Sequence, residues 1–305
     1  MEILSKIVPI AMLTFVLSSM LSMGLNLTVA QILAPLRNYR LIVLALLANF
    51  VLMPLAAFGI AKLLRLDEPL AIALLLLGTA SGAPFLPLLA RISKGNLAFS
   101  VGLMVLLMVV TVGYMPLVLP LFLEGVSVDP LKIGQSLVFL MMVPLAIGLL
   151  VKARLNGLAT KVQPSLGKVS ILSLASLIVL LLITNMQNLL NLYGTRGVLA
   201  SILFIAGGCG IGWVLGGLQS DTRGVMSLGT AQRNIAAALV VGGQNFSDPK
   251  VIVMVVVVAI VGLLILMPLA KYLAKFSKAT SQQLDPSPNV QSLEQSAADG
   301  ARRAS

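Results

Sequence analysis

The stretch Leu228–Asn245, LGTAQRNIAAALVVGGQN, places an arginine inside an apolar segment that is long enough to cross a membrane. A charged side chain at the centre of a bilayer costs about 3 kcal/mol even on lenient insertion scales, so Arg233 is expected to serve a purpose. A related stretch, LGTAS, occupies Leu77–Ser81. Polar, glycine-containing clusters that interrupt two apolar segments are typical of secondary transporters with two discontinuous helices.

The composition agrees with a membrane protein. The chain has 305 residues, of which 58% are hydrophobic and 10% charged, with a mean hydropathy of +1.04. Soluble domains carry about 25% charged residues, so we predict an all-α polytopic membrane protein. The single cysteine, Cys209, excludes an internal disulfide, and with no histidine in the chain a His/Cys metal site is excluded. No segment offers a nucleophile with a base, an acid pair or a metal set, so an enzyme is not expected.

About nine segments have the roughly 20 residues that cross about 30 Å of hydrocarbon. They are residues 7–33, 41–64, 69–92, 97–123, 132–151, 169–191, 198–218, 224–245 and 250–274. The first reaches the length of a membrane span and has no small-residue cleavage site, so no cleaved signal peptide is expected. We therefore expect a transporter domain over residues 1–276 and a disordered cytoplasmic tail over 277–305, which is polar and rich in Ser and Gln.

If these segments cross the membrane in turn, lysine and arginine are distributed unequally between its two sides. Fourteen fall on one side, six on the other, and Arg233 is left inside a segment. The net charge of +11 therefore indicates topology, not nucleic-acid binding. The positive-inside rule puts the C-terminus in the cytoplasm and the N-terminus outside, in a plasma (inner) membrane. The two clusters lie in the third and eighth segments, and this odd offset predicts two inverted repeats, about 1–123 and 130–276.

Both clusters are expected to break their helices. Glycine leaves helical geometry at low cost and proline removes a backbone donor, and Gly78, Gly82, Pro84 and Pro87 crowd the third segment. The freed backbone groups must be buried in protein or line a cavity. Half-helix N-termini are partly positive, so two of them beside Arg233 would favour an anion. The alternative is that these are packing kinks. The candidate substrate-binding residues are Thr79, Ser81, Gly82, Arg233 and Asn234.

Several stretches carry a resemblance to a known family. They are MGLNL (Met23–Leu27), ANFVLMP (Ala48–Pro54), GTAS (Gly78–Ser81), ARISKGNLAFS (Ala90–Ser100) and the interrupted eighth segment. In their order and spacing the chain resembles the bile acid:sodium symporter family, which includes carriers of small organic anions. The resemblance implies ten helices in two inverted repeats, divided into a panel and a core domain, with two discontinuous helices crossing at the substrate and sodium sites. This chain would lack the first helix.

The resemblance also implies ion-binding positions: Asn49, Ser81, Ser100, Thr230 and Gln232. The chain departs from the family at several of the sodium positions, which include Gly229 in place of a glutamate and Arg233 in place of a glutamine. Arginine is always protonated, and like charges at close range in a low dielectric repel by several kcal/mol. No Asp or Glu lies inside a segment to pair with it. Arg233 is therefore expected to be a fixed charge in place of a bound cation.

Two functions follow as hypotheses. The first is a secondary transporter of small organic anions that works by alternating access, with no cofactor, and with Na⁺ as the coupling ion that the family suggests; uniport, exchange and proton coupling stay open. The second is an anion-binding membrane receptor or sensor that has the fold but carries no flux. The expected partners are the organic anion and the lipid bilayer, with no nucleic acid, and the chain is expected to be a monomer or loose dimer.

Overall fold

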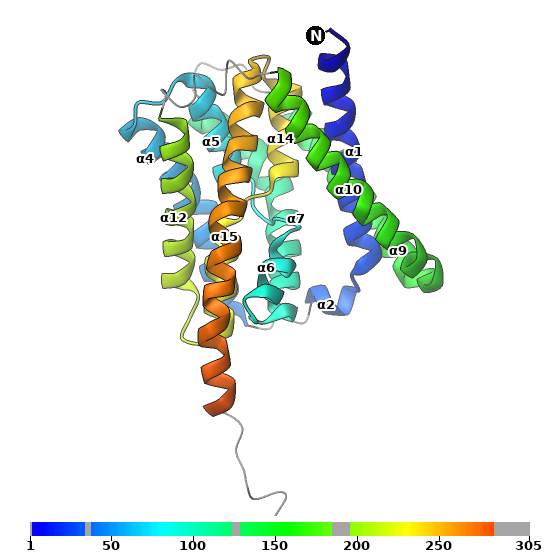
Figure 1. Ribbon diagram of the computed structural model, residues 1–305, viewed down its shortest axis with the longest axis vertical. Coiled ribbons are helices and arrows are strands. Elements are labelled where there is room, and N and C mark those ends of the chain that lie inside the picture. The colour runs from blue at the N-terminus through cyan, green and yellow to red at the C-terminus, as the bar shows by residue number, and fades with distance from the viewer. Residues whose placement is uncertain (1, 34–37, 124–128, 185–195, 284–305) are drawn as a thin grey trace, which may run out of the picture.

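The computed structural model describes residues 2–33, 38–123, 129–184 and 196–283, and all regular structure in these ranges is helical (Figure 1), as the sequence predicted. The elements are α1 (Glu2–Asn26), α2 (Val29–Leu33), α3 (Tyr39–Leu47), the π-helical turn η2 (Ala48–Leu52), α4 (Met53–Leu63), α5 (Glu68–Thr79), α6 (Leu86–Ile92), α7 (Leu97–Phe122), α8 (Pro130–Leu137), the π-helical turn η3 (Val138–Met142), α9 (Val143–Arg154), α10 (Asn156–Thr184), α12 (Gly197–Leu215), α13 (Ser220–Ala231), α14 (Ile235–Asn245) and α15 (Pro249–Gln283).

Seven continuous helical stretches in the described ranges are long and apolar enough to cross a membrane: residues 7–26, 39–63, 97–122, 130–154, 156–180, 197–215 and 249–275. The third and eighth predicted segments are instead interrupted helices. In the third, α5 ends at Thr79 and α6 begins at Leu86; in the eighth, α13 ends at Ala231 and α14 begins at Ile235. The total of nine crossings and the inverted repeat stay predictions.

Three of the expected segments have different bounds in the structure. The first, expected over residues 7–33, is divided into α1, which ends at Asn26, and the short helix α2. Helix α10 begins at Asn156, directly after α9, although we expected a connection up to residue 169. The start of α10 contains Lys161 and Lys168, which lower its hydropathy, but the structure shows it as helix packed along α1. Helix α15 continues to Gln283, past the predicted start of the tail at 277. Residues 284–305, the rest of that predicted tail, lie outside the described ranges.

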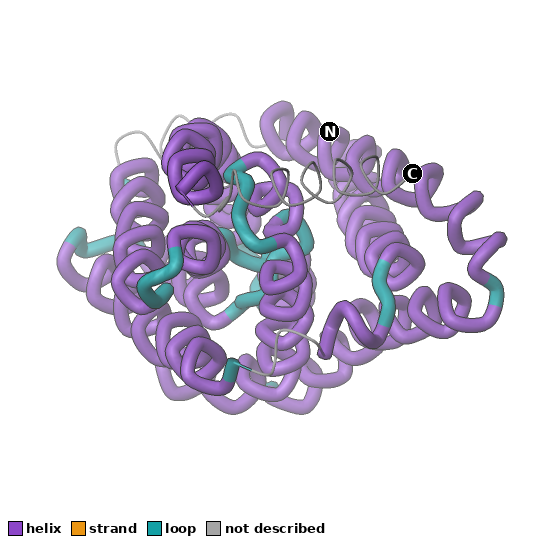
Figure 2. Tube along the Cα trace, turned by 90° about the horizontal axis from the view of Figure 1, so that it is seen from below, coloured by secondary structure: helices purple, strands orange, loops and turns teal. Residues whose placement is uncertain are grey.

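The helices pack in two groups. Helices α1, α9 and α10 pack on one another at one side of the molecule, and the two interrupted helices lie with α4, α7, α12 and α15 at the other (Figure 1). Seen from below, the linking segments of the interruptions are surrounded by helices (Figure 2). Glycine allows the α1–α9 contact, because a Cβ on Gly24 would lie 2.3 Å from the carbonyl oxygen of Leu145. This division resembles the expected panel and core.

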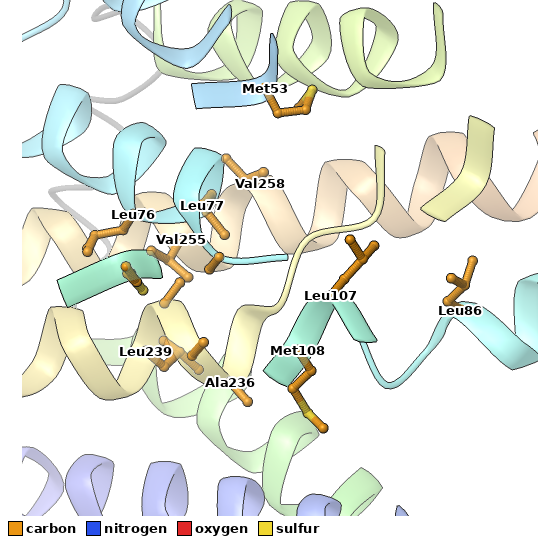
Figure 3. Packing of buried hydrophobic residues seen from close by; sticks show 14 of the residues in the cluster. Met53, Leu76, Leu77, Leu86, Leu107, Met108, Ala236, Leu239, Val255 and Val258 are labelled. Atoms are coloured by element: carbon orange, nitrogen blue, oxygen red, sulfur yellow. The ribbon is translucent and has the colours of Figure 1, made fainter. Parts of the chain in front are cut away.

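Apolar side chains from six helices meet around the interruptions (Figure 3). They come from α4, α5, α6, α7, α14 and α15, and they include Met53, Leu76, Leu77, Leu86, Leu107, Met108, Ala236, Leu239, Val255 and Val258. Water is excluded from such a core, so the backbone groups that the interruptions release have to find partners within the protein. The polar cluster described next supplies those partners.

Candidate functional site

The first interruption follows the end of α5 and passes tightly against α7. Ala80 is extended (φ −90°, ψ 99°), which stops the helix. Gly82 has φ +81°, a conformation that favours glycine, and a Cβ there would lie 2.2 Å from the backbone nitrogen of Met108. Gly82 therefore permits both the turn of the chain and its close approach to α7.

The second interruption is joined to the first by Asn234. Its backbone N–H donates to the carbonyl oxygen of Ala80 (3.1 Å), and its Nδ2 donates to that of Gly82 (3.1 Å). Its Oδ1 accepts from the N–H of Ala237 (3.1 Å), which caps the first turn of α14. One buried asparagine thus begins a half-helix and holds the two interruptions together.

Arg233 is 2% exposed and binds the C-terminal ends of the two preceding half-helices. Its Nε donates to the carbonyl oxygen of Leu77 (2.8 Å) and its Nη2 to that of Gly78 (2.8 Å), near the end of α5. Its Nη1 donates to the carbonyl oxygen of Thr230 (3.0 Å), near the end of α13. Helix C-termini are partly negative, so the guanidinium lies where a cation is favoured. The sequence had suggested a place beside the N-terminal ends.

Asn49 connects this guanidinium to the second predicted segment. Its Oδ1 accepts from Nη1 of Arg233 (2.8 Å) and from the hydroxyl of Ser81 (2.8 Å). Its Nδ2 donates to the carbonyl oxygen of Ala45 (3.0 Å) and to Oγ1 of Thr230 (3.4 Å). Asn49 lies in the π-helical turn η2, a type of irregularity that is frequent at functional sites.

Helix α7 contributes two polar residues that we had not singled out. Oγ1 of Thr111 accepts from the N–H of Ser81 (2.9 Å) and donates to its carbonyl oxygen (3.1 Å). The hydroxyl of Tyr114 donates to the carbonyl oxygen of Phe50 in η2, and the two rings lie 4.8 Å apart. The sequence did contain a sign of their role. Both are polar residues within a long apolar helix, and a buried polar group requires a hydrogen-bond partner.

The predicted residues are only partly brought together. Asn49, Ser81, Thr230, Arg233 and Asn234 form one network, which we call the crossover cluster. Gly82 joins it through its backbone carbonyl oxygen, and within the described ranges the other predicted side chains make no hydrogen bond to it. Thr79 bonds within its own helix, to the carbonyl oxygen of Leu75; Ser100 bonds to that of Leu97; and Gln232 is partly buried at the edge.

The crossover cluster has few free hydrogen-bonding groups and little empty volume in which a ligand could bind. Within the described ranges, no buried side-chain nitrogen or oxygen lacks a hydrogen-bond partner. The space lined by Arg233 and Gln232 measures about 10 Å³. That is about the volume one water molecule requires, and it is too small for an organic anion.

A larger cavity, of about 450 Å³, lies between the two helix groups. Its α1 and α10 wall is polar and includes Ser19, Ser22, Asn26, Gln163 and Ser170. Its opposite wall, from the first interruption, α6 and α7, is mostly apolar and includes Pro84, Pro87, Leu88, Val101 and Met104. Arg91, which the sequence had used only to assign topology, is the single charged residue among the described residues that line this cavity. None of the predicted substrate-binding residues lines this cavity, although Pro84 follows Gly82 closely in the chain.

At the opposite end of the α1–α10 group the two helix groups are in contact. Helix α8, which continues through η3 into α9 of the first group, packs on α7 and on α14, and the hydroxyl of Ser136 in α8 donates to the side-chain oxygen of Gln244 in α14. A Cβ on Gly243 would lie 3.0 Å from the terminal carbon of Met12 in α1. The space between the groups is therefore asymmetric, with a cavity at one end and packed helices at the other.

Comparison with known proteins identifies one family. The model of the sodium bile acid symporter family matches residues 12–192. A probable sodium/metabolite cotransporter of Oryza sativa chloroplasts is 25% identical over 246 residues, which are 79% of this chain and 60% of the relative. An uncharacterized sodium-dependent transporter of Bacillus subtilis is 28% identical over 198 residues, 65% of this chain and 60% of the relative. The hepatic sodium/bile acid cotransporter of Rattus norvegicus is 30% identical over 156 residues, 49% of this chain and 43% of the relative. The chain thus spans between 43% and 60% of the length of these relatives.

Proposed function

The chain belongs to the sodium bile acid symporter family, and we propose that it is a secondary transporter of small organic anions that works by alternating access. The relatives are named as cotransporters of metabolites or bile acids, which supports transport and not catalysis. The two interrupted helices, joined near their interruptions, support the same class, because transporter sites are typically built from such helices.

The observation that carries this proposal is the 450 Å³ cavity between the helix groups. A volume of this size lies within the range of about 300–1,000 Å³ that is typical of small-molecule sites. It has one hydrogen-bonding wall and one apolar wall, so it fits a solute with a polar edge and an apolar face. The substrate would lie against the first interruption, where movement of the α1–α10 group could alter its access.

Arg91 supports an anionic substrate. It belongs to the last turn of α6, and in the described part of the chain no carboxylate lines the cavity with it. A hydrogen bond to a charged partner contributes about 1.5–3 kcal/mol. A carboxylate in this cavity would therefore be held at the Arg91 end. Within the proposal, Thr79, Ser81, Gly82 and Asn234 maintain the interruption behind the cavity wall, and Arg233 contributes charge without touching the substrate.

Replacing Arg91 with glutamine should weaken anion binding about tenfold, because a charge-assisted hydrogen bond is lost. The matched control is Arg154→Gln, which removes an exposed cation at the end of α9 that does not line the cavity. Binding of octanoate and of submicellar cholate to the purified proteins by calorimetry measures the difference. Equal affinities in the Arg91 variant, the Arg154 variant and the wild type would contradict the assignment.

The contact between α8 and α14 provides a test of transport itself. With Cys209 replaced by alanine, cysteines at positions 136 and 244 should form a disulfide on oxidation, because the two native side chains are hydrogen-bonded. Uptake of labelled cholate into proteoliposomes should fall to background on oxidation and return on reduction, since the helix groups can no longer separate there. The two single-cysteine variants serve as controls. Uptake that continues through the crosslinked protein would refute alternating access by this movement.

We also propose an orientation. The excess of Lys and Arg places the C-terminus in the cytoplasm and the N-terminus outside. The cavity, at the end of the bundle where α2 and α6 lie (Figure 1), then faces the cytoplasm, and the α8–α14 contact faces outward. The plasma (inner) membrane is the compartment that this orientation fits.

A further inference from the structure

Four oxygen atoms converge on the guanidinium of Arg233. Three are backbone carbonyl oxygens, of Leu77, Gly78 and Thr230, and the fourth is Oδ1 of Asn49; all lie 2.8–3.0 Å from an arginine nitrogen. They come from three separate helical segments, α5, α13 and η2. A convergence of oxygens from separate elements is a built cation site, and here its occupant is part of the chain.

The electrostatics of the two half-helices require a positive charge at this place. Each helix C-terminus carries the equivalent of about half a negative charge, and the C-terminal ends of α5 and α13 both meet here, in a buried environment. In secondary transporters such ends, together with unwound backbone carbonyls, are where Na⁺ or a proton is held. The relatives described above are named as sodium-dependent.

We propose that Arg233 is a permanent cation that replaces exchangeable sodium in the crossover cluster, so that this chain binds its organic anion without Na⁺. The inference rests on the proposed transport function. It differs from what the names of the relatives suggest, since a guanidinium that is covalently attached cannot leave the site. The cluster therefore has no empty state, and a sodium gradient has no site there through which to act.

The surroundings of Arg233 leave no place for a second cation. No Asp or Glu occurs in residues 39–63, 69–123 or 224–245, so no carboxylate from these stretches offsets an added charge. The described residues also contain no group of three or more acidic, histidine or cysteine side chains that could hold a metal ion. The oxygen of Asn49 is already shared between two donors, Nη1 of Arg233 and the hydroxyl of Ser81.

Replacing Arg233 with glutamine should convert the site to one that binds sodium. The four oxygens would remain, and the glutamine oxygen could add a fifth, with no fixed positive charge to repel the ion. Arg223→Gln is the matched control, because Arg223 also belongs to α13 and also donates to a backbone carbonyl, that of Trp213 (2.8 Å), but is only partly buried.

The test is the melting temperature of the purified proteins in sodium chloride and in potassium chloride at equal ionic strength, with and without potassium cholate. The wild type and Arg223→Gln should melt at the same temperature in both salts, and cholate should stabilise the wild type equally in both. Arg233→Gln should melt lower in potassium and regain part of the loss as sodium is titrated.

Two results would overturn the proposal: a sodium-specific rise in the melting temperature of the wild type, or a folded Arg233→Gln protein that does not distinguish the two salts. If that variant does not fold, the wild-type measurement alone decides. Failure of the transport proposal would look different, since cholate would then bind in both salts without being taken up by proteoliposomes.

Discussion

Replacing Arg233 with alanine should lower the free energy of unfolding by about 3–5 kcal/mol, the cost of breaking a buried charge network. The substitution leaves the carbonyl oxygens of Leu77, Gly78 and Thr230 without their donor, and it leaves two partly negative helix ends facing each other. For a chain of this size the melting temperature should fall by roughly 10 °C. Thermal unfolding of the two proteins in detergent and potassium salt measures this difference in melting temperature.

Arg223→Ala is the control for this loss. It removes one hydrogen bond, to the carbonyl oxygen of Trp213, and a contact of the guanidinium over the Trp213 ring at 4.6 Å. Because this residue is only partly buried, the cost should stay below about 1 kcal/mol. An Arg233→Ala protein that is as stable as Arg223→Ala would mean that the crossover cluster does not depend on its cation.

Replacing Gly82 with alanine should abolish uptake and destabilise the protein by at least about 3 kcal/mol. Two costs add: φ of +81° is strained for any residue with a Cβ, and that Cβ would lie 2.2 Å from the backbone nitrogen of Met108 and 2.7 Å from the carbonyl oxygen of Met104. Backbone atoms of α7 cannot move aside as a flexible side chain can. Melting temperature and cholate uptake by proteoliposomes are the measurements.

Gly113→Ala is the matched control for Gly82→Ala. Gly113 lies in α7, where an added Cβ has no neighbouring atom within 4 Å. Alanine is favoured over glycine in a helix by up to about 1 kcal/mol, so this variant should be as stable as the wild type or slightly more stable. If Gly82→Ala behaves in the same way, the close approach of the first interruption to α7 does not hold in the protein.

The sequence was sufficient to predict where the two helices are interrupted, and its candidates include the five residues of the crossover cluster, but it did not show which candidates would meet. Glycine and proline at 78–87 act through local backbone geometry, so their effect can be predicted without knowledge of the fold. Arg233 stood out because an isolated charge in an apolar segment has few acceptable environments. Asn49 was indicated by the family resemblance, and the structure places its side chain against Arg233.

The direction of the Arg233 side chain could not be predicted. Half-helices have both a positive and a negative end near an interruption, and only the tertiary crossing decides which end a side chain reaches. The structure brings the C-terminal ends of α5 and α13 to Arg233, which changes its interpretation from a group that attracts an anion to one that satisfies carbonyl oxygens. The cavity was also beyond prediction, since Ser22 and Gln163 become neighbours only through the packing of α1 on α10.

The most direct test of the account is the uptake of labelled cholate by proteoliposomes that contain the wild-type protein, with sodium or potassium as the only external alkali cation. The account predicts equal, saturable uptake in both salts, reduced in Arg91→Gln. Uptake that requires sodium would contradict the role of Arg233 as a permanent cation. Binding of cholate without any uptake would contradict transport and favour a receptor.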